Sequence, residues 1–344
     1  MLRISRPAFF PLSRGEGESC LLPAGEEKGK AHPRELHVAA GIIEDDQGRV
    51  LLSQRAAHGE HPNLWEFPGG KLEPGEDAPA ALQRELMEEL GVEVMPLRRV
   101  HCVRWREPER MLVLDGWRVR VVAGVARGLQ GQALLWVPLP KLRATPMPPA
   151  DVPLCSALQL SEVMWITPGL TSAVDLPDWL SQLDARLERG IRWVQLRLPG
   201  ADRALLALAA QALAERCRIV GARWLLNGDP EDARVLRADG VHLSAAALRA
   251  CALPLRDVPF LIGASCHNAE ELACAAGLGL DYATLSPLHV TSTHPHALPL
   301  GDAQFAALLR DCPLPVFALG GVGIDDLDHV RALGAFGVAG IRNV

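Results

Sequence analysis

The chain has 344 residues, a length that suits two domains better than one. Hydrophobic residues make up 49% and charged residues 22%, so a disordered chain is excluded and substantial buried cores are expected. A net charge of −6 argues against direct nucleic-acid binding, and no apolar run reaches the roughly 18–20 residues that span a membrane. The eight cysteines form no CxxC pair, which favours reduced thiols in a cytoplasmic protein.

The first half of the chain predicts strands around one strong helix. Residues 1–35 have no continuous apolar signal core, and we expect a poorly ordered extension there; an overlong start of the chain would give the same pattern. Strand patterns follow at 36–45 and 49–55, separated by the turn sequence DDQG. A helix is predicted at about 77–90, ending at Gly91 as its C-cap.

Further strand patterns at 117–126 and 133–139, a proline-rich stretch and a short helix complete a first domain at 36–160. From residue 163 the chain alternates between strands and Ala/Leu-rich amphipathic helices. The strand patterns begin at residues 163, 192, 223, 240, 260, 282, 316 and 336. Eight strands and seven intervening helices predict a (β/α)8 TIM barrel at 163–344 that lacks the last helix. The predicted fold class is therefore α/β with two domains.

The acidic helix carries the clearest chemical pattern. Glu85, Glu88 and Glu89 share one helical face, where like charges four residues apart weaken a helix by a few tenths of a kcal/mol. A divalent cation would offset this repulsion, and Mg²⁺ prefers oxygen ligands. The alternative is an exposed acidic helix that binds no ligand.

The spacing around this helix runs Gly70, five residues, Glu76, seven residues, Arg84-Glu85-Leu86, one residue, Glu88-Glu89, one residue, Gly91-Val92. It resembles the Nudix box at every defining position, and the resemblance extends over about 36–160. It implies a sandwich of helices around a mixed sheet, and Mg²⁺-dependent hydrolysis of nucleoside diphosphate derivatives, with Mn²⁺ as an alternative ion. The implied roles are metal ligation by Glu85, Glu88, Glu89 and the carbonyl of Gly69, carboxylate orientation by Arg84, and loop support by Glu76.

Segments outside the box, including VAAGIIED, LLSQRAAHGEHPNLWEFPGGKLEPGE and MPPAD, resemble the MutT group of that family. This implies hydrolysis of 8-oxo-dGTP to 8-oxo-dGMP and pyrophosphate, a reaction of nucleotide-pool sanitation and DNA repair. The implied substrate contacts are Arg55, Phe67, Gly70, Lys71 and Asp151. An aromatic ring at Phe67 would stack on a purine, although core packing explains that residue equally well.

Two positions depart from the MutT pattern. Asp151 stands where the group has a base-reading asparagine, and a carboxyl group donates a hydrogen bond only when it is protonated. Gln130 replaces a glutamate that binds metal or acts as general base, so another carboxylate would have to take over that role. Other nucleoside triphosphates and nucleotide sugars therefore remain open as substrates.

Residues 163–344 resemble the thiamine phosphate synthase and TenI family. The resemblance implies a site for a phosphorylated ligand at Gln195, Arg197, Asn227, Ser265, Thr291, Thr293, Gly320 and Gly321, mainly at the carboxyl ends of strands. Pro199 and His294 stand at lysine positions of the synthases, and Gly228 stands at a metal-binding aspartate, with Asp229 next to it. Pro287 replaces the catalytic histidine of the tautomerase branch. These losses remove charge stabilisation and predict a degenerate barrel.

Two alternatives for the barrel stay open: a catalytic domain of a bifunctional enzyme, and a ligand-sensing module that regulates the hydrolase. His289, His294 and His296 lack a known ligand spacing, which disfavours a metal cluster within that loop. His242 and His267 are interpreted as structural histidines rather than catalytic ones.

Overall fold

The computed structural model describes residues 34–251, 261–291 and 298–344. The predicted extension lies outside these ranges, except that its last two residues belong to the first strand. None of the helices in the described ranges is both long and apolar enough to cross a membrane. The seven cysteines in these ranges are free.

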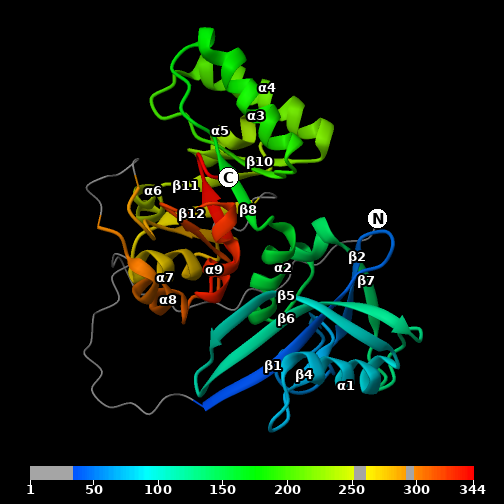
Figure 1. Ribbon diagram of the computed structural model, residues 1–344. Helices are drawn as coiled ribbons and strands as arrows, with labels where there is room; N and C mark the ends of the chain where they lie inside the picture. Colours follow the sequence, from blue (N-terminus) through cyan, green and yellow to red (C-terminus); the bar gives the residue numbers. More distant parts are fainter. Residues whose placement is uncertain (1–33, 252–260, 292–297) are drawn as a thin grey trace. The chain divides into compact units, whose positions relative to one another are not determined.

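The N-terminal part contains two sheets. A mixed four-stranded sheet has the order β4-β1-β6-β5, and an antiparallel three-stranded sheet has the order β3-β2-β7 (Figure 1). The strands are β1 (Arg34–Ile43), β2 (Arg49–Gln54), β3 (Trp65–Glu66), β4 (Gly69–Lys71), β5 (Glu93–Arg106), β6 (Arg110–Ala123) and β7 (Leu134–Pro138). The sequence patterns had missed β5, which pairs with β6 through several register shifts around Pro96 and so lacks a clean alternation.

Two helices cover opposite faces of the mixed sheet. Helix α1 (Ala78–Leu90) packs with Ala39 and Ile43 of β1, whereas α2 (Val152–Gln159) belongs to a second apolar cluster with Ala40 and Ile42. Alternate residues of β1 therefore point to opposite layers, as the pleat of a strand requires. The α/β/α sandwich with a mixed sheet is confirmed. Two 3₁₀ segments, η1 (Leu139–Ala144) and η2 (Pro149–Asp151), lead into α2.

Helix α1 begins and ends where its sequence indicates. The side chain of Asp77 accepts a hydrogen bond from the Ala80 N–H at 2.9 Å and caps the first turn. Gly91 ends the helix with φ of 68°, a left-handed conformation that glycine adopts without strain. Leu82, Leu86 and other apolar residues are buried along one face, which leaves the acidic face toward β4 and the solvent.

The C-terminal part is a closed barrel of eight parallel strands with helices around the outside of the strand ring (Figure 1). The strands are β8 (Val163–Ile166), β9 (Trp193–Leu196), β10 (Arg223–Asn227), β11 (Gly240–Leu243), β12 (Leu261–Cys266), β13 (Tyr282–Leu285), β14 (Val316–Leu319) and β15 (Gly337–Gly340). The helices are α3 (Leu176–Glu188), α4 (Arg203–Val220), α5 (Pro230–Val235), α6 (Ala245–Ala250), α7 (Ala269–Gly277), α8 (Gly301–Leu309) and α9 (Leu327–Ala332), with 3₁₀ segments η3 (Ala173–Asp175) and η4 (Ile324–Asp326). The predicted TIM barrel is confirmed.

Candidate functional site

Arg84 organises the acidic face of α1. Its guanidinium donates to both oxygens of Glu76, at 3.0 and 2.8 Å, and to Oε1 of Glu85 at 2.8 Å. It also donates to the backbone carbonyl of Lys71 at 3.1 Å. The hydrogen bonds to Glu76 and Glu85 raise the pKa of Arg84, and the bond from Arg84 lowers the pKa of Glu76. Arg84 therefore stays charged and ties the Glu85 carboxylate to the loop before the helix.

The two glycines of β4 allow this carboxylate to lie against the strand. A Cβ at Gly70 would stand 2.2 Å from the carboxyl carbon of Glu85, so any side chain there would displace the carboxylate. Gly69 has φ of 145°, and a Cβ there would meet the Ala39 carbonyl oxygen at 2.1 Å. The Gly69 N–H also hydrogen-bonds the Glu89 carboxylate. Gly70 thus makes room for the acidic face.

Glu89 is partly buried close to other carboxylates, which disfavours its negative charge. Burial, together with the nearby Glu85, Glu66 and Glu88, raises the pKa of Glu89 to about 7. Glu88 is more exposed, with 58% of its side chain accessible, and lies 3.8 Å from Arg84. Clustered carboxylates that repel one another are what a bound cation would stabilise.

The three glutamates do not form a closed cluster. In the ranges that the structure describes, the one group of three ligand side chains whose ligand atoms all lie within 4.8 Å of one another is found elsewhere, in the barrel. The all-oxygen donor set, with the Glu85 carboxylate seated against Gly70, nevertheless fits Mg²⁺, which retains waters and substrate phosphates and needs only a partial protein shell. Glu85, Glu88 and Glu89 are the side chains that would hold it.

A cavity of about 230 Å³ is lined by Gly69 and Lys71 of β4, whereas Glu85, Glu88 and Glu89 do not line it. Four of the predicted substrate contacts line it, namely Arg55, Phe67, Lys71 and Asp151. Gly70 does not line the cavity and lies against Glu85 instead. Phe67 is 4% exposed, and its N–H donates a long hydrogen bond of 3.4 Å to Asp151. The structure therefore gathers residues that lie 96 positions apart in the sequence into one small pocket.

Asp151 is a neutral acid in this pocket. Its side chain is buried, and burial together with the nearby Glu66 raises the pKa of Asp151 to about 8, against the opposing effect of Arg55. Burial also raises the pKa of Glu66, although Glu66 forms an ion pair with Arg55. Asp151 therefore carries a proton at neutral pH and can both donate and accept a hydrogen bond.

Sequence reasoning missed most of the other residues that line this cavity, among them three that carry a charge or an aromatic ring next to the predicted contacts. Glu66, Trp105 and Arg110 line it together with the predicted contacts. Glu66 directly precedes Phe67 in the WEFPGG segment, so its position next to a predicted contact was an available signal. Trp105 and Arg110 lie at the facing ends of β5 and β6, and no local pattern predicted β5.

The loop that holds Gln130 is tied to α1 by its neighbour. Gln132 donates from Nε2 to the Glu89 carbonyl at 3.1 Å and accepts the Gln130 N–H at Oε1. The Gln130 side chain is exposed and cannot act as a general base.

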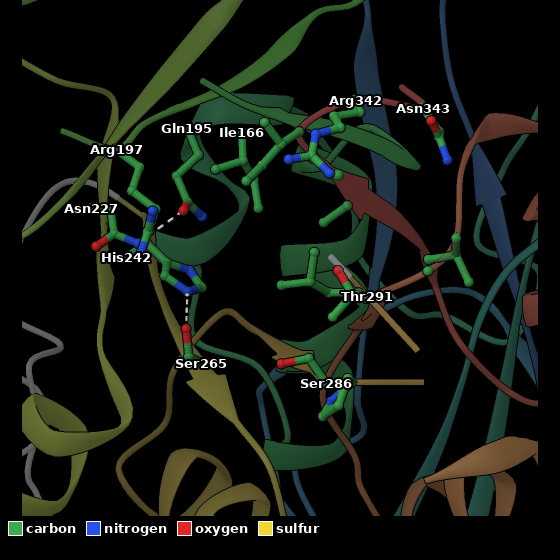
Figure 2. Close-up of a pocket in the computed structure, with 18 of the residues that line it drawn as sticks. Ile166, Gln195, Arg197, Asn227, His242, Ser265, Ser286, Thr291, Arg342 and Asn343 are labelled. Atoms are coloured by element: carbon green, nitrogen blue, oxygen red, sulfur yellow. Dashed lines mark hydrogen bonds between the residues drawn. The ribbon is translucent and has the colours of Figure 1, made fainter. Parts of the chain in front are cut away.

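The barrel contains a larger cavity of about 1070 Å³. Seven of the eight predicted residues line it: Gln195, Arg197, Asn227, Ser265, Thr291, Gly320 and Gly321. Thr293 and His294 lie outside the described residues. Figure 2 shows Gln195, Asn227, His242 and Ser265 along one side of this cavity, and Asn227 donates to Gln195 at 2.9 Å. Asp229, next to the missing metal aspartate, does not line the cavity and caps α5.

Buried His242, on β11, contacts a side chain of another strand through each of its two ring nitrogens. His242 Nδ1 lies 2.9 Å from the Tyr282 hydroxyl, and Nε2 lies 2.9 Å from Ser265 Oγ (Figure 2 shows the bond to Ser265). Burial lowers the pKa of His242 to about 3, so the ring is neutral, with one nitrogen donating and the other accepting. His267, at the same cavity, donates from Nδ1 to the Ser286 carbonyl at 2.8 Å.

The turn after β14 holds two consecutive glycines in the left-handed region. Gly320 and Gly321 have φ of 95° and 70°, and side chains there would meet Pro287 and His289 within 2.9 Å. Both glycines line the cavity, and without side chains they leave the backbone open to a ligand there. Arg197 and Arg342 bring positive charge to the same cavity.

The fold and the two cavities define a two-part α/β protein, with an acidic helix against a mixed sheet in one part and a closed parallel barrel in the other. Residues 35–155 match the NUDIX domain model, and residues 166–344 match the thiamine monophosphate synthase model. The Escherichia coli CTP pyrophosphohydrolase is 40% identical over 36% of this chain and 90% of its own length. The 8-oxo-dGTP diphosphatase of the same organism is 34% identical over 37% of this chain and 98% of its own. A thiamine-phosphate synthase of Synechocystis is 34% identical over 48% of each chain. The chain therefore belongs to the Nudix family in its N-terminal part and to the thiamine monophosphate synthase family in its C-terminal part.

Proposed function

We propose that the Nudix part is a Mg²⁺-dependent nucleoside triphosphate pyrophosphohydrolase that acts on an oxidised purine nucleotide. Its first candidate substrate is 8-oxo-dGTP. The observation that carries this proposal is the Arg84-oriented Glu85 carboxylate against β4, the strand whose Gly69 and Lys71 line the cavity together with the buried Asp151. The products would be 8-oxo-dGMP and pyrophosphate, and the cellular role nucleotide-pool sanitation.

Each residue has a defined task in this proposal. A bound Mg²⁺ would neutralise phosphate charge and lower the pKa of a water molecule. Arg84 holds one oxygen of Glu85 and leaves the other for the ion. Phe67 offers an apolar wall to the base, and Lys71 adds positive charge at the cavity. Asp151 donates to an acceptor such as the purine O6 and accepts from the neighbouring N1–H.

CTP is the second candidate substrate. A relative that is 40% identical bears the name CTP pyrophosphohydrolase. The neutral Asp151 carboxyl would also complement cytosine, by donating to N3 and accepting from the N4 amino group. The two substrates differ in ring size, so the cavity rather than the carboxyl group would discriminate between them.

The test is a panel of nucleotides with Mg²⁺, in which release of pyrophosphate is scored against release of orthophosphate. We expect 8-oxo-dGTP to give the highest kcat/KM, with pyrophosphate as product. Glu85→Gln should lower kcat at least about 100-fold in a protein that still unfolds cooperatively, because the amide oxygen can still accept from Arg84 whereas the negative charge for the metal is lost. Glu215→Gln, an exposed glutamate on α4, is the matched control. Full turnover by Glu85→Gln would contradict the proposed metal site, and a clear preference for CTP would replace the proposed substrate.

For the barrel, at residues 163–344, we propose a ligand-binding role without thiamine phosphate synthesis. The cavity keeps Arg197, Asn227 and the glycine turn, which suit a phosphorylated ligand. Pro199 and His294 stand where the synthases have lysines, and Gly228 stands where they have a metal-binding aspartate. A thiazole phosphate should raise the melting temperature of the full chain without being consumed. Formation of thiamine phosphate from a thiazole phosphate and a pyrimidine diphosphate would show that the barrel is a synthase and the protein bifunctional.

A further inference from the structure

Two histidines converge on one carboxylate on the outside of the barrel. His289 lies in the loop between β13 and α8, Asp302 lies in the first turn of α8, and His329 lies in α9. The Nε2 atom of His289 is 3.1 Å from Oδ1 of Asp302, and the Nε2 atom of His329 is 3.0 Å from Oδ2. The three side chains are 42%, 45% and 46% exposed, so an ion from solution can reach them.

The spacing of these ligand atoms suits a metal ion. Zinc–nitrogen and zinc–oxygen bonds of about 2.0–2.2 Å place neighbouring ligand atoms about 2.9–3.4 Å apart in octahedral or tetrahedral geometry. The two nitrogen–oxygen distances here fall in that range; each histidine contacts a different oxygen of Asp302, and when no ion is bound the His289 contact is a hydrogen bond that an ion would replace. All three ligand atoms lie within 4.8 Å of one another, so an ion can reach them with small side-chain rotations.

The backbone holds His289 in place for this role. Its N–H donates to the Gly320 carbonyl at 3.0 Å, and the preceding Leu288 N–H donates to Leu319 at 2.9 Å. On the other side, the Gly301 N–H donates to the Leu288 carbonyl at 3.0 Å, which ties this loop to the start of α8. His289 and Asp302 are thus positioned by hydrogen-bonded backbone and not by the ion itself, and such preorganisation favours binding.

We propose that His289, Asp302 and His329 form a site for one divalent transition-metal ion, with Zn²⁺ as the first candidate. Two imidazoles and one carboxylate favour Zn²⁺, Co²⁺ or Ni²⁺ over Mg²⁺, because imidazole is a softer ligand than water or carboxylate. Water would fill the remaining positions. This site is separate from the acidic face of α1 and does not depend on the proposed hydrolase activity.

The ion would act on the rim of the barrel cavity. Val290 and Thr291, which directly follow His289, line the cavity, as do Gly320 and Gly321. A bound ion would tie His289, and with it the cavity-lining Val290 and Thr291, to α8 and α9. The inferred role is structural: the ion would hold the cavity wall at Val290 and Thr291 in place.

The test uses the full chain, stripped with a chelator and titrated with Zn²⁺ in millimolar Mg²⁺, which occupies all-oxygen sites. Competition with a chromophoric chelator measures the number of Zn²⁺ ions bound. We expect His329→Gln and Asp302→Asn each to bind one equivalent less than the wild type. His37→Gln is the matched control, since His37 is an exposed histidine that pairs with a carboxylate of Glu35 at 3.1 Å without a second histidine.

Two further measurements separate metal binding from folding. Co²⁺ should give visible d–d absorption in the wild type that both variants lose. Zn²⁺ should raise the melting temperature of the wild type by mass action but not that of Asp302→Asn, whose amide preserves the side-chain shape. Metal-free melting temperatures equal to the wild type would show that the variants fold. Equal Zn²⁺ binding by the wild type and both folded variants, or an equal loss in His37→Gln, would overturn the inference.

Discussion

Replacing Asp151 by Asn tests the claim that this acid is protonated in the folded protein. Burial and Glu66 raise its pKa to about 8, from 3.8 for an unperturbed aspartate. Between these two values the folded state holds a proton that the unfolded state has released, so stability falls as pH rises. The stability cost is absent below about pH 3.8 and complete above about pH 8. The asparagine side chain has the same shape and no such proton equilibrium.

The size of the effect follows from the two pKa values. At pH 7 the linkage cost of Asp151 is at most about 4 kcal/mol, from about 1.36 kcal/mol per pH unit across the interval from 3.8 to 7. Asp151→Asn should therefore be more stable than the wild type at pH 7, and its advantage should grow with pH by up to about 1.4 kcal/mol per unit until pH 8. Glu66, Arg55 and Cys155 face the same group and are unchanged in the variant.

Urea denaturation at pH 5, 6, 7 and 8 measures this difference. Asp46→Asn, a substitution in an exposed turn of the same part of the chain, provides the control and should show no pH-dependent gain. A pH-independent difference between Asp151→Asn and the wild type would refute a raised pKa for Asp151. The same proton should affect recognition of the base, so kcat/KM of the wild type for 8-oxo-dGTP should fall as pH rises through about 8.

Three further predictions follow from the two sites. Gly70→Ala should lower kcat for nucleotide hydrolysis at least about 10-fold, because the alanine Cβ would stand 2.2 Å from the Glu85 carboxyl carbon. The control is Gly277→Ala, which has open space around its position and should not change kcat. Chelation of divalent ions should abolish hydrolysis and Mg²⁺ should restore it, whereas activity that survives chelation would contradict a metal mechanism. Tyr282→Phe should destabilise the protein by about 1–3 kcal/mol in urea denaturation, since it leaves a ring nitrogen of buried His242 without its partner; an unchanged unfolding midpoint would show that the bond contributes nothing.

The order of the elements and the acidic helix were predictable from the sequence because their signals are local. Asp77 and Gly91 bound α1 through contacts within a few residues. The barrel strands appear as short apolar runs between amphipathic helices, and each of the eight contains residues of the predicted pattern. The spacing of the acidic residues also defines which face of the helix they share, since that depends only on the helical repeat.

Contacts between distant segments needed the tertiary structure. The pairing of β5 with β6 brings Trp105 and Arg110 to the cavity that Asp151 lines, and its register shifts hide the strand from pattern analysis. The raised pKa of Asp151 arises from burial beside Glu66, 85 residues earlier, and no local pattern encodes that burial.

The loop that contains His289 also shows the difference between what local sequence signals predict and what the packing of the fold decides. The sequence alone associated His289 with its near neighbours His294 and His296, which gave no convincing ligand spacing. The fold instead places His289 beside Asp302 and His329, from two different helices. Sequence patterns determine elements because helices and strands depend on neighbours within a few residues. Which side chains meet depends on how those elements pack, and only the closed barrel brings these three together.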